Sequence, residues 1–164
     1  MFKNALLYRF SAAVGMDLIC RLSDAITMFP LRELLATDMA LSGFVPVLAD
    51  GPFAQWYGST VYVNLAVRQR VIPAAQISEA FAQRLTEIEI VEGRKPRGKE
   101  RKRIKDEVLV DLMPHAPIVT KRTLALLDTA NGFLAVNSSA PKVAEQVVSM
   151  LRLALGSFPA LPVR

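Results

Sequence analysis

Residues 56–70 read WYGSTVYVNLAVRQR, and this stretch decides the fold class. Apolar residues recur at every second position within it, at Val61, Val63, Leu65 and Val67. A period of two is typical of a β-strand that buries one face in a hydrophobic core. We therefore expect a long strand here, with other strands of the chain paired beside it.

A different period follows this strand, because apolar residues now recur at every third or fourth position. Pro73 stands where a helix can begin, and we expect that helix to run from about residue 74 to 91. Gly93, Pro96 and Gly98 interrupt the pattern, and a second helix is expected from Lys99 until Pro114. Two helices joined by a short breaker tend to fold back on each other as an αα-hairpin.

The segments before residue 56 predict a strand at residues 5–10 and a helix after Ser11 that Pro30 ends. Thr37 and Asp38 resemble the cap of one helical turn that Gly43 ends. Residues 44–48 contain Pro46, so they are expected to form an edge strand at best.

The segments after residue 117 predict two strands, at 123–128 and 133–137, joined by the turn pair Asn131-Gly132. A last helix is expected to begin at Pro141 and to end at Gly156. The order β-α-β-β-α-α-β-β-α predicts an α+β fold, with a largely antiparallel sheet packed with helices and a protruding basic helical hairpin. We expect residues 1–73 and 118–164 to form the body, and residues 74–117 to form a finger inserted in it.

The composition excludes several classes of protein. With 52% apolar residues in a chain of 164, disorder and collagen-like structure are excluded. One cysteine, Cys20, and one histidine, His115, can form neither an internal disulfide nor a cysteine zinc site, and we expect the Cys20 thiol to be buried. No secretory signal is visible and no uncharged apolar run reaches the length of a membrane span, so we expect a cytoplasmic protein that contacts no membrane.

The positive charge is concentrated in one place. The chain carries a net charge of +5, but residues 93–105, GRKPRGKERKRIK, alone carry +7. A dense basic run is the usual footprint of a nucleic acid, although a solvated surface, an anionic membrane and an acidic protein also fit such a charge. The candidate phosphate-binding residues are Arg94, Lys95, Arg97, Lys99, Arg101, Lys102, Arg103 and Lys105, with Lys121 and Arg122 after them.

Signals for catalysis are weak. No glycine-rich phosphate loop is present, and His115 has no triad partner in the sequence. Asp106, Glu107 and Asp111 are the closest approach to a metal-binding carboxylate cluster, but ion pairs with Lys102 and Arg103 are the alternative interpretation. We therefore expect no enzyme, no catalytic residue, no metal and no cofactor. Aromatic residues are not interleaved with the basic run, so we expect contact with the DNA backbone and no base stacking.

Several blocks of sequence together resemble one known family. They are residues 2–9, FKNALLYR; Asp38-Met39 with residues 43–46, GFVP; residues 92–95 with 105–108 and 112–114; residues 128–132, DTANG; and residues 155–159, LGSFP. In this order they resemble the RdgC family of recombination-associated proteins. The resemblance implies a homodimeric ring that binds duplex DNA without sequence preference, is associated with the nucleoid and restrains the recombinase RecA by occupying DNA.

Two departures from the family pattern bear on this expectation. Family members are about twice as long, so the chain resembles their N-terminal half and is expected to be a fragment or a short, phage-borne relative. The end of the finger, which tends to read Leu-Leu-Pro-Arg-Ala-Phe in the family, reads LMPHAP here, so a finger-tip contact would involve His115 and Pro117. Two other functions stay open: a module whose basic finger docks on an acidic partner such as a recombinase, and a metal-dependent nuclease.

Overall fold

The computed structural model describes residues 4–163, apart from the side chains of residues 12–17, 19 and 20. The chain divides into two compact units, which are described separately. The first contains Met1–Arg32, Ser42–Val67 and Thr120–Arg164, and the second contains Glu33–Leu41 and Arg68–Val119. The boundaries of body and finger that the sequence suggests stay a prediction, and the Cys20 thiol lies outside the described side chains.

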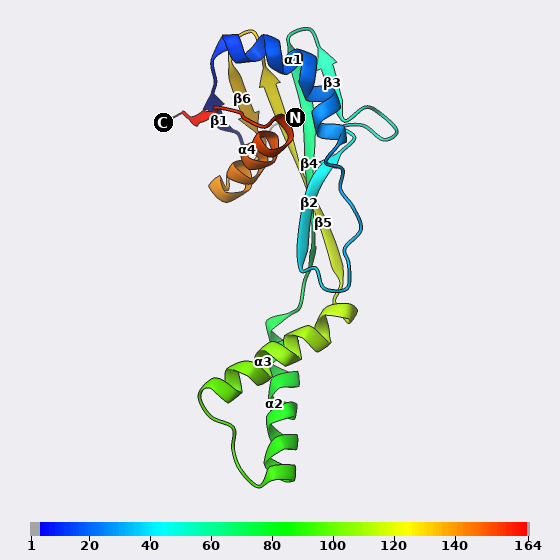
Figure 1. Ribbon diagram of the computed structural model, residues 1–164, viewed down its shortest axis with the longest axis vertical. Helices are drawn as coiled ribbons and strands as arrows, with labels where there is room; N and C mark the ends of the chain where they lie inside the picture. The colour runs from blue at the N-terminus through cyan, green and yellow to red at the C-terminus, as the bar shows by residue number, and fades with distance from the viewer. Residues whose placement is uncertain (1–3, 164) are drawn as a thin grey trace. The chain divides into compact units, whose positions relative to one another are not determined.

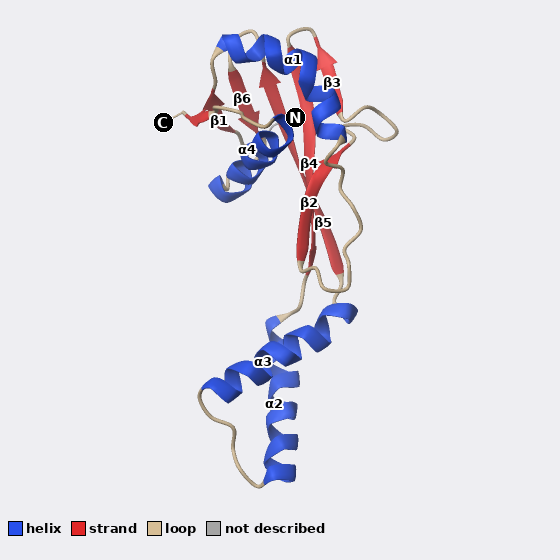
Figure 2. Cartoon of the chain, in the orientation of Figure 1, coloured by secondary structure: helices blue, strands red, loops and turns tan. Residues whose placement is uncertain are grey.

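The described residues form runs of consecutive strands and a pair of consecutive helices, in an α+β arrangement (Figures 1 and 2). The strands form one antiparallel sheet of seven, in the order β2-β4-β5-β6-β1-β7, with β3 paired to β4. This confirms the predicted fold class. The elements are β1 (Leu6–Arg9), α1 (Ala12–Thr27), β2 (Ala40–Val45), β3 (Ala54–Tyr57), β4 (Thr60–Arg70), α2 (Ala74–Glu92), α3 (Lys99–Leu112), a 3₁₀ turn (Met113–His115), β5 (Ile118–Asp128), β6 (Phe133–Val136), α4 (Pro141–Leu155) and β7 (Leu161–Pro162).

One hydrophobic core holds the first unit together. Helices α1 and α4 contact each other, and their buried residues join those of the strands in a single cluster. Val61, Val63 and Leu65 of β4 belong to it, as the period of two predicts, but Asn64 and Ala66 on the opposite face of the strand are buried as well. The helical members of the cluster are Leu18, Leu22 and Ile26 of α1 and Ala144, Val147, Val148, Leu151 and Leu155 of α4.

The helical turn expected at residues 37–43 is wrong, because residues 40–45 form strand β2. The chain before it runs alongside the strand: the N–H of Leu31 donates to the carbonyl of Phe44 at 3.0 Å, and the N–H of Phe44 donates to the carbonyl of Phe29 at 2.8 Å. A Cβ atom on Gly43 would clash with backbone atoms of Pro30 and Leu31. Gly43 is therefore needed for a close approach between two segments, and it does not end a helix.

The strand expected within residues 56–70 is confirmed as β4, Thr60–Arg70, and the residues before it form a further strand, β3. The chain turns between the two strands at Gly58, whose φ is 60°, and Tyr57 pairs with Thr60, so β3 and β4 form a tight hairpin. Strand β5 begins five residues before the predicted position, at Ile118. The predicted order thus lacks β3 and the short β7, which pairs with β1.

Candidate nucleic-acid interface

The predicted helical hairpin is present in the second unit. Helices α2 and α3 occupy nearly the expected residues and contact each other, crossing rather than lying side by side along their length (Figure 2). Ile104 and Val108 of α3 are buried, whereas α2 buries no residue completely. The apolar stripe of α2 is half-buried, at Ile77, Phe81, Leu85 and Ile88.

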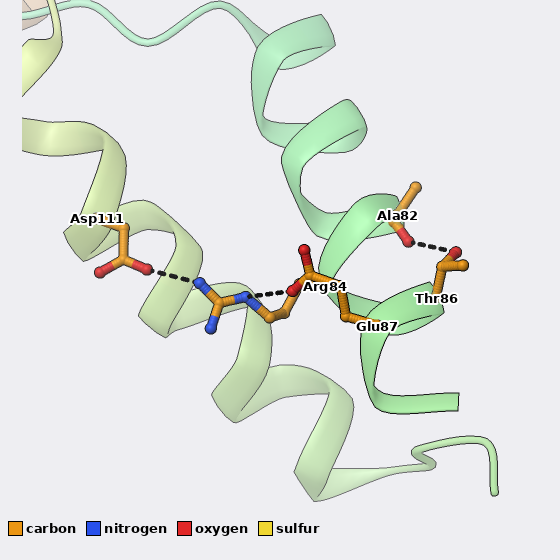
Figure 3. Close-up of polar contacts among 5 residues, drawn as sticks. All are labelled: Ala82, Arg84, Thr86, Glu87 and Asp111. Carbon is orange, nitrogen blue, oxygen red and sulfur yellow. Dashed lines mark hydrogen bonds and ion pairs between the residues drawn. The ribbon is translucent and has the colours of Figure 1, made fainter. Parts of the chain in front are cut away.

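An ion pair ties the two helices together. Arg84 Nη2 on α2 lies 3.0 Å from Asp111 Oδ2 on α3, and its Nε lies 3.7 Å from Glu87 Oε2 (Figure 3). The hydroxyl of Thr86 donates to the carbonyl of Ala82 one turn earlier in the same helix. Asp111, one of the carboxylates considered for a metal site, therefore pairs with an arginine.

The loop between the helices is closed by a second set of ion pairs. Gly93 ends α2 in the left-handed conformation, with φ 65°, and its N–H donates to the carbonyl of Glu89. Arg94 donates from Nη1 and Nη2 to the two carboxylate oxygens of Glu100, each at 2.8 Å, and its Nη2 lies 2.6 Å from Glu92 Oε2. These hydrogen bonds hold the pKa of Glu100 below its ordinary value and raise the pKa of Arg94.

Two further candidate residues also have acidic partners. Lys95 Nζ lies 3.4 Å from Glu89 Oε1, and Arg103 Nε lies 3.3 Å from Glu107 Oε1. Three of the eight predicted phosphate-binding cations are thus compensated by carboxylates of the same hairpin. Glu107, like Asp111, is engaged in pairing with an arginine.

The other five cations keep their charge uncompensated. The guanidinium of Arg101 lies over the ring of Phe81, with its carbon 5.2 Å from the ring centroid. Within the described residues, none of the five makes an ion pair, and all are exposed: Arg97, Lys99, Arg101, Lys102 and Lys105. They belong to the loop and to the first two turns of α3, so this short stretch is the candidate interface.

The remaining predicted residues lie elsewhere in the chain. Lys121 and Arg122 are exposed on β5 but belong to the first unit, so the structure does not group them with the hairpin. As neighbours on a strand, they project from opposite faces. His115 and Pro117 follow α3 and are exposed, and the finger-tip contact expected of them stays a prediction.

The ion pair of Arg103 with Glu107 was one of the two interpretations of the sequence, but the acidic partners of Arg94 and Lys95 and the ring beside Arg101 were not predicted. Residues 74–117 carry nine Lys and Arg against eight Asp and Glu, a net charge of +1, although the basic run itself carries +7. The sequence did hold one sign of the pairing, because Glu89 and Glu92 in the last turn of α2 stand just before the basic run of residues 93–105. Phe81 carried no signal, since it lies twenty residues before Arg101 in the sequence.

Within the described part of the chain, no group of three His, Cys, Asp or Glu side chains is arranged to hold a metal ion. No helix among the same residues combines the length and the apolar character needed to cross a membrane.

Comparison with known proteins identifies the family. A family model described as "Putative exonuclease, RdgC" matches residues 1–164. The recombination-associated protein RdgC of Xanthomonas oryzae pv. oryzae PXO99A is 35% identical over 98% of this chain and 54% of its own length. Those of Xanthomonas campestris pv. campestris B100 and Xylella fastidiosa M12 are 34% and 32% identical, again over 98% of this chain and 53% of their own lengths.

The chain therefore spans about half the length of the curated relatives it matches. The family match, in contrast, covers every residue of the chain, including the hairpin. The chain belongs to the RdgC family of recombination-associated proteins.

Proposed function

We propose that the chain binds duplex DNA without sequence preference through the basic hairpin, and that it modulates RecA-dependent recombination by occupying DNA. Membership of a recombination-associated family supports the biological setting. The observation that carries the DNA-binding proposal is the group of five exposed cations, with no carboxylate partner among the described residues, on the loop and the start of α3.

This arrangement suits a phosphate backbone better than base edges. Lysine and arginine side chains that neutralise phosphates release condensed counterions, which gives affinity without reading sequence. The three compensated cations, Arg94, Lys95 and Arg103, contribute less, because a phosphate would have to displace a carboxylate from each. The net charge of the whole hairpin is small, so the uncompensated group is the relevant electrostatic feature.

The salt dependence of binding tests this proposal. Fluorescence anisotropy with two labelled duplexes of unrelated sequence is measured at several salt concentrations. Neutralising five phosphates predicts a log–log slope of about −4.5 for both duplexes. Equal affinities at every salt concentration would support binding without sequence preference. A flat salt response, or affinities that differ by orders of magnitude between the duplexes, would refute the proposal.

The effect on recombination needs a separate experiment. RecA-promoted strand exchange is followed while the protein is added at concentrations below and above those that saturate the duplex. Inhibition that begins only when the duplex is saturated supports occupation of DNA as the mechanism. Inhibition at concentrations well below those that saturate the duplex would instead support the alternative, in which the basic hairpin docks on an acidic protein. Pull-down of a recombinase that persists after nuclease treatment would support the same alternative.

A homodimer and a cytoplasmic location on the nucleoid belong to the same proposal, since the family resemblance implies them. Sedimentation of the chain with and without duplex tests the dimer. His115→Ala and Pro117→Ala test whether the end of the hairpin contributes to it, because both residues are exposed there.

The description of the matching family model makes exonuclease activity the second function to test. Asp111 and Glu107 pair with Arg84 and Arg103, so two of the carboxylates considered for Mg²⁺ already have cationic partners. We therefore assign binding, and not cleavage, to the hairpin. Mg²⁺-dependent shortening of an end-labelled duplex that Asp106→Asn or Glu107→Gln abolishes would overturn this assignment.

A further inference from the structure

We propose that Arg101 is an oriented phosphate-binding fork on the hairpin and that Phe81 is the residue that positions it. This inference rests on the proposed DNA binding and assigns distinct roles within the cations that carry it. The ligand class is the phosphate group of a nucleic-acid backbone.

The contact between the two residues fixes the guanidinium without neutralising it. The guanidinium carbon of Arg101 lies 5.2 Å from the centroid of the Phe81 ring, a distance at which the negative face of the ring attracts a cation. A ring carries no net charge, so Arg101 keeps its full positive charge. Arg94 shows the opposite arrangement, because both of its terminal nitrogens donate to the Glu100 carboxylate.

The positions of both residues suit this role. Phe81 is half-buried on α2, whereas Arg101 is exposed on α3, so the ring is anchored while the donors of the guanidinium remain accessible to solvent. A planar guanidinium can donate two parallel hydrogen bonds to one phosphate, which the ammonium group of lysine cannot do. Ordering the side chain before binding also reduces the entropy lost when a phosphate binds.

A second cation lies beside the same ring. Lys105 follows Arg101 by one helical turn, and together with Phe81 it lines a hollow of about 220 Å³. The hollow is also lined by Ala74, Ile77 and Ser78 at the start of α2. Of these three residues, only Ser78 has a polar side chain. Arg101 does not line this hollow, but Lys105 is one helical turn from Arg101, so a phosphate bound by Arg101 would lie near a second cation.

The chain supplies a matched control for each partner. Arg103 lies on the same helix but pairs with Glu107, so Arg103→Lys changes the same chemical group at a compensated position. Arg9 lies over Phe133 with its guanidinium carbon 5.4 Å from the ring centroid, so Phe133→Leu removes an equivalent stack in the first unit.

Duplex affinity of these variants at low salt tests the assignment. Arg101→Lys and Phe81→Leu are expected to weaken binding about two- to fivefold, while Arg103→Lys and Phe133→Leu leave it unchanged. Phe81→Tyr keeps the ring and is expected to bind like the original chain. If Phe81→Leu loosens the hairpin, as circular dichroism and thermal melting would reveal, Arg101→Lys and Phe81→Tyr still decide the question.

Two results would overturn the inference: unchanged affinity in Arg101→Lys, or a loss in folded Phe81→Tyr as large as that in Phe81→Leu. A failure of the proposed function is a different result, because the unaltered chain itself would then show no salt-dependent binding to duplex DNA. If the unaltered chain binds duplex DNA and Arg101→Lys binds it equally well, the role proposed for Arg101 is wrong and the proposed DNA-binding function stands.

Discussion

Arg94 and Glu100 form two parallel hydrogen bonds, each 2.8 Å long, across the loop that joins α2 to α3. The pair closes a loop that begins at Gly93 and reaches Gly98, both with positive φ. A cation held in this way shapes the loop and is less available to a phosphate. Ion pairs with the neighbouring glutamates therefore engage Arg94 and Lys95, and they leave other basic residues of the hairpin without a carboxylate partner.

The first prediction concerns the titration of Glu100. Its pKa lies below the ordinary value chiefly because Arg94 donates to the ionised carboxylate. The pair therefore stabilises the loop at neutral pH, and this contribution is lost as the pH falls from the ordinary range of a carboxyl group through the lowered pKa of Glu100. Replacing Arg94 with Gln should raise the Glu100 pKa toward the ordinary value.

Carbon-detected NMR titration of the Glu100 carboxyl measures this shift directly. Asp128 is the internal control, since its pKa is lowered by hydrogen bonds from Asn131 and should not respond to Arg94→Gln. A Glu100 midpoint that is the same in both proteins would contradict the assigned cause.

The second prediction concerns the tie between the helices. Arg84 and Asp111 lie 3.0 Å apart, but their side chains are 44% and 61% exposed, so solvent screens the pair. Arg84→Gln and Asp111→Asn should each lower the free energy of unfolding by no more than about 1 kcal/mol. A double-mutant cycle from urea unfolding gives the coupling energy. A coupling of several kcal/mol would mean that the pair is more important to the hairpin than its exposure indicates.

The third prediction concerns Gly43, which has no room for a Cβ atom against Pro30 and Leu31. Gly43→Ala should lower the free energy of unfolding by about 1–3 kcal/mol, because the two backbone segments must move apart. Gly51→Ala is the control, since the nearest atom to its added Cβ would be 3.3 Å away. Equal effects of the two substitutions would show that the approach of these segments does not depend on Gly43.

Local sequence patterns were sufficient for most of the fold. The 3.6-residue period and the stop at Gly93 predict α2 almost to the residue, and Gly156 marks the end of α4 in the same way. The first residues of strand β2 were missed, because Thr37, Asp38 and Gly43 have the composition of a capped turn. The interaction that decides its structure, with residues 29–31, comes from a distant segment.

The site was predictable only in outline for a similar reason. The density of lysine and arginine locates the candidate interface, but it cannot tell a cation that has a carboxylate partner from one that has none. That distinction depends on where α2 places Glu89, Glu92 and Phe81 relative to the loop and α3. These are contacts of α2 with the loop and with α3, and neither period nor composition encodes them.

We propose that duplex binding depends on the uncompensated cations of the hairpin and not on its basic composition. Two triple variants, each removing three positive charges, test this claim. The first changes Arg97, Lys99 and Lys102 to Gln, and the second changes the compensated residues Arg94, Lys95 and Arg103 to Gln. Circular dichroism of both variants checks that the helices remain.

The decisive measurement is the log–log slope of duplex affinity against salt concentration for the unaltered chain and the two triple variants. We predict that the first variant loses about 2.7 from the magnitude of the slope and the second loses less than about 1. Equal losses in the two folded variants, or no salt dependence in the unaltered chain, would contradict the account.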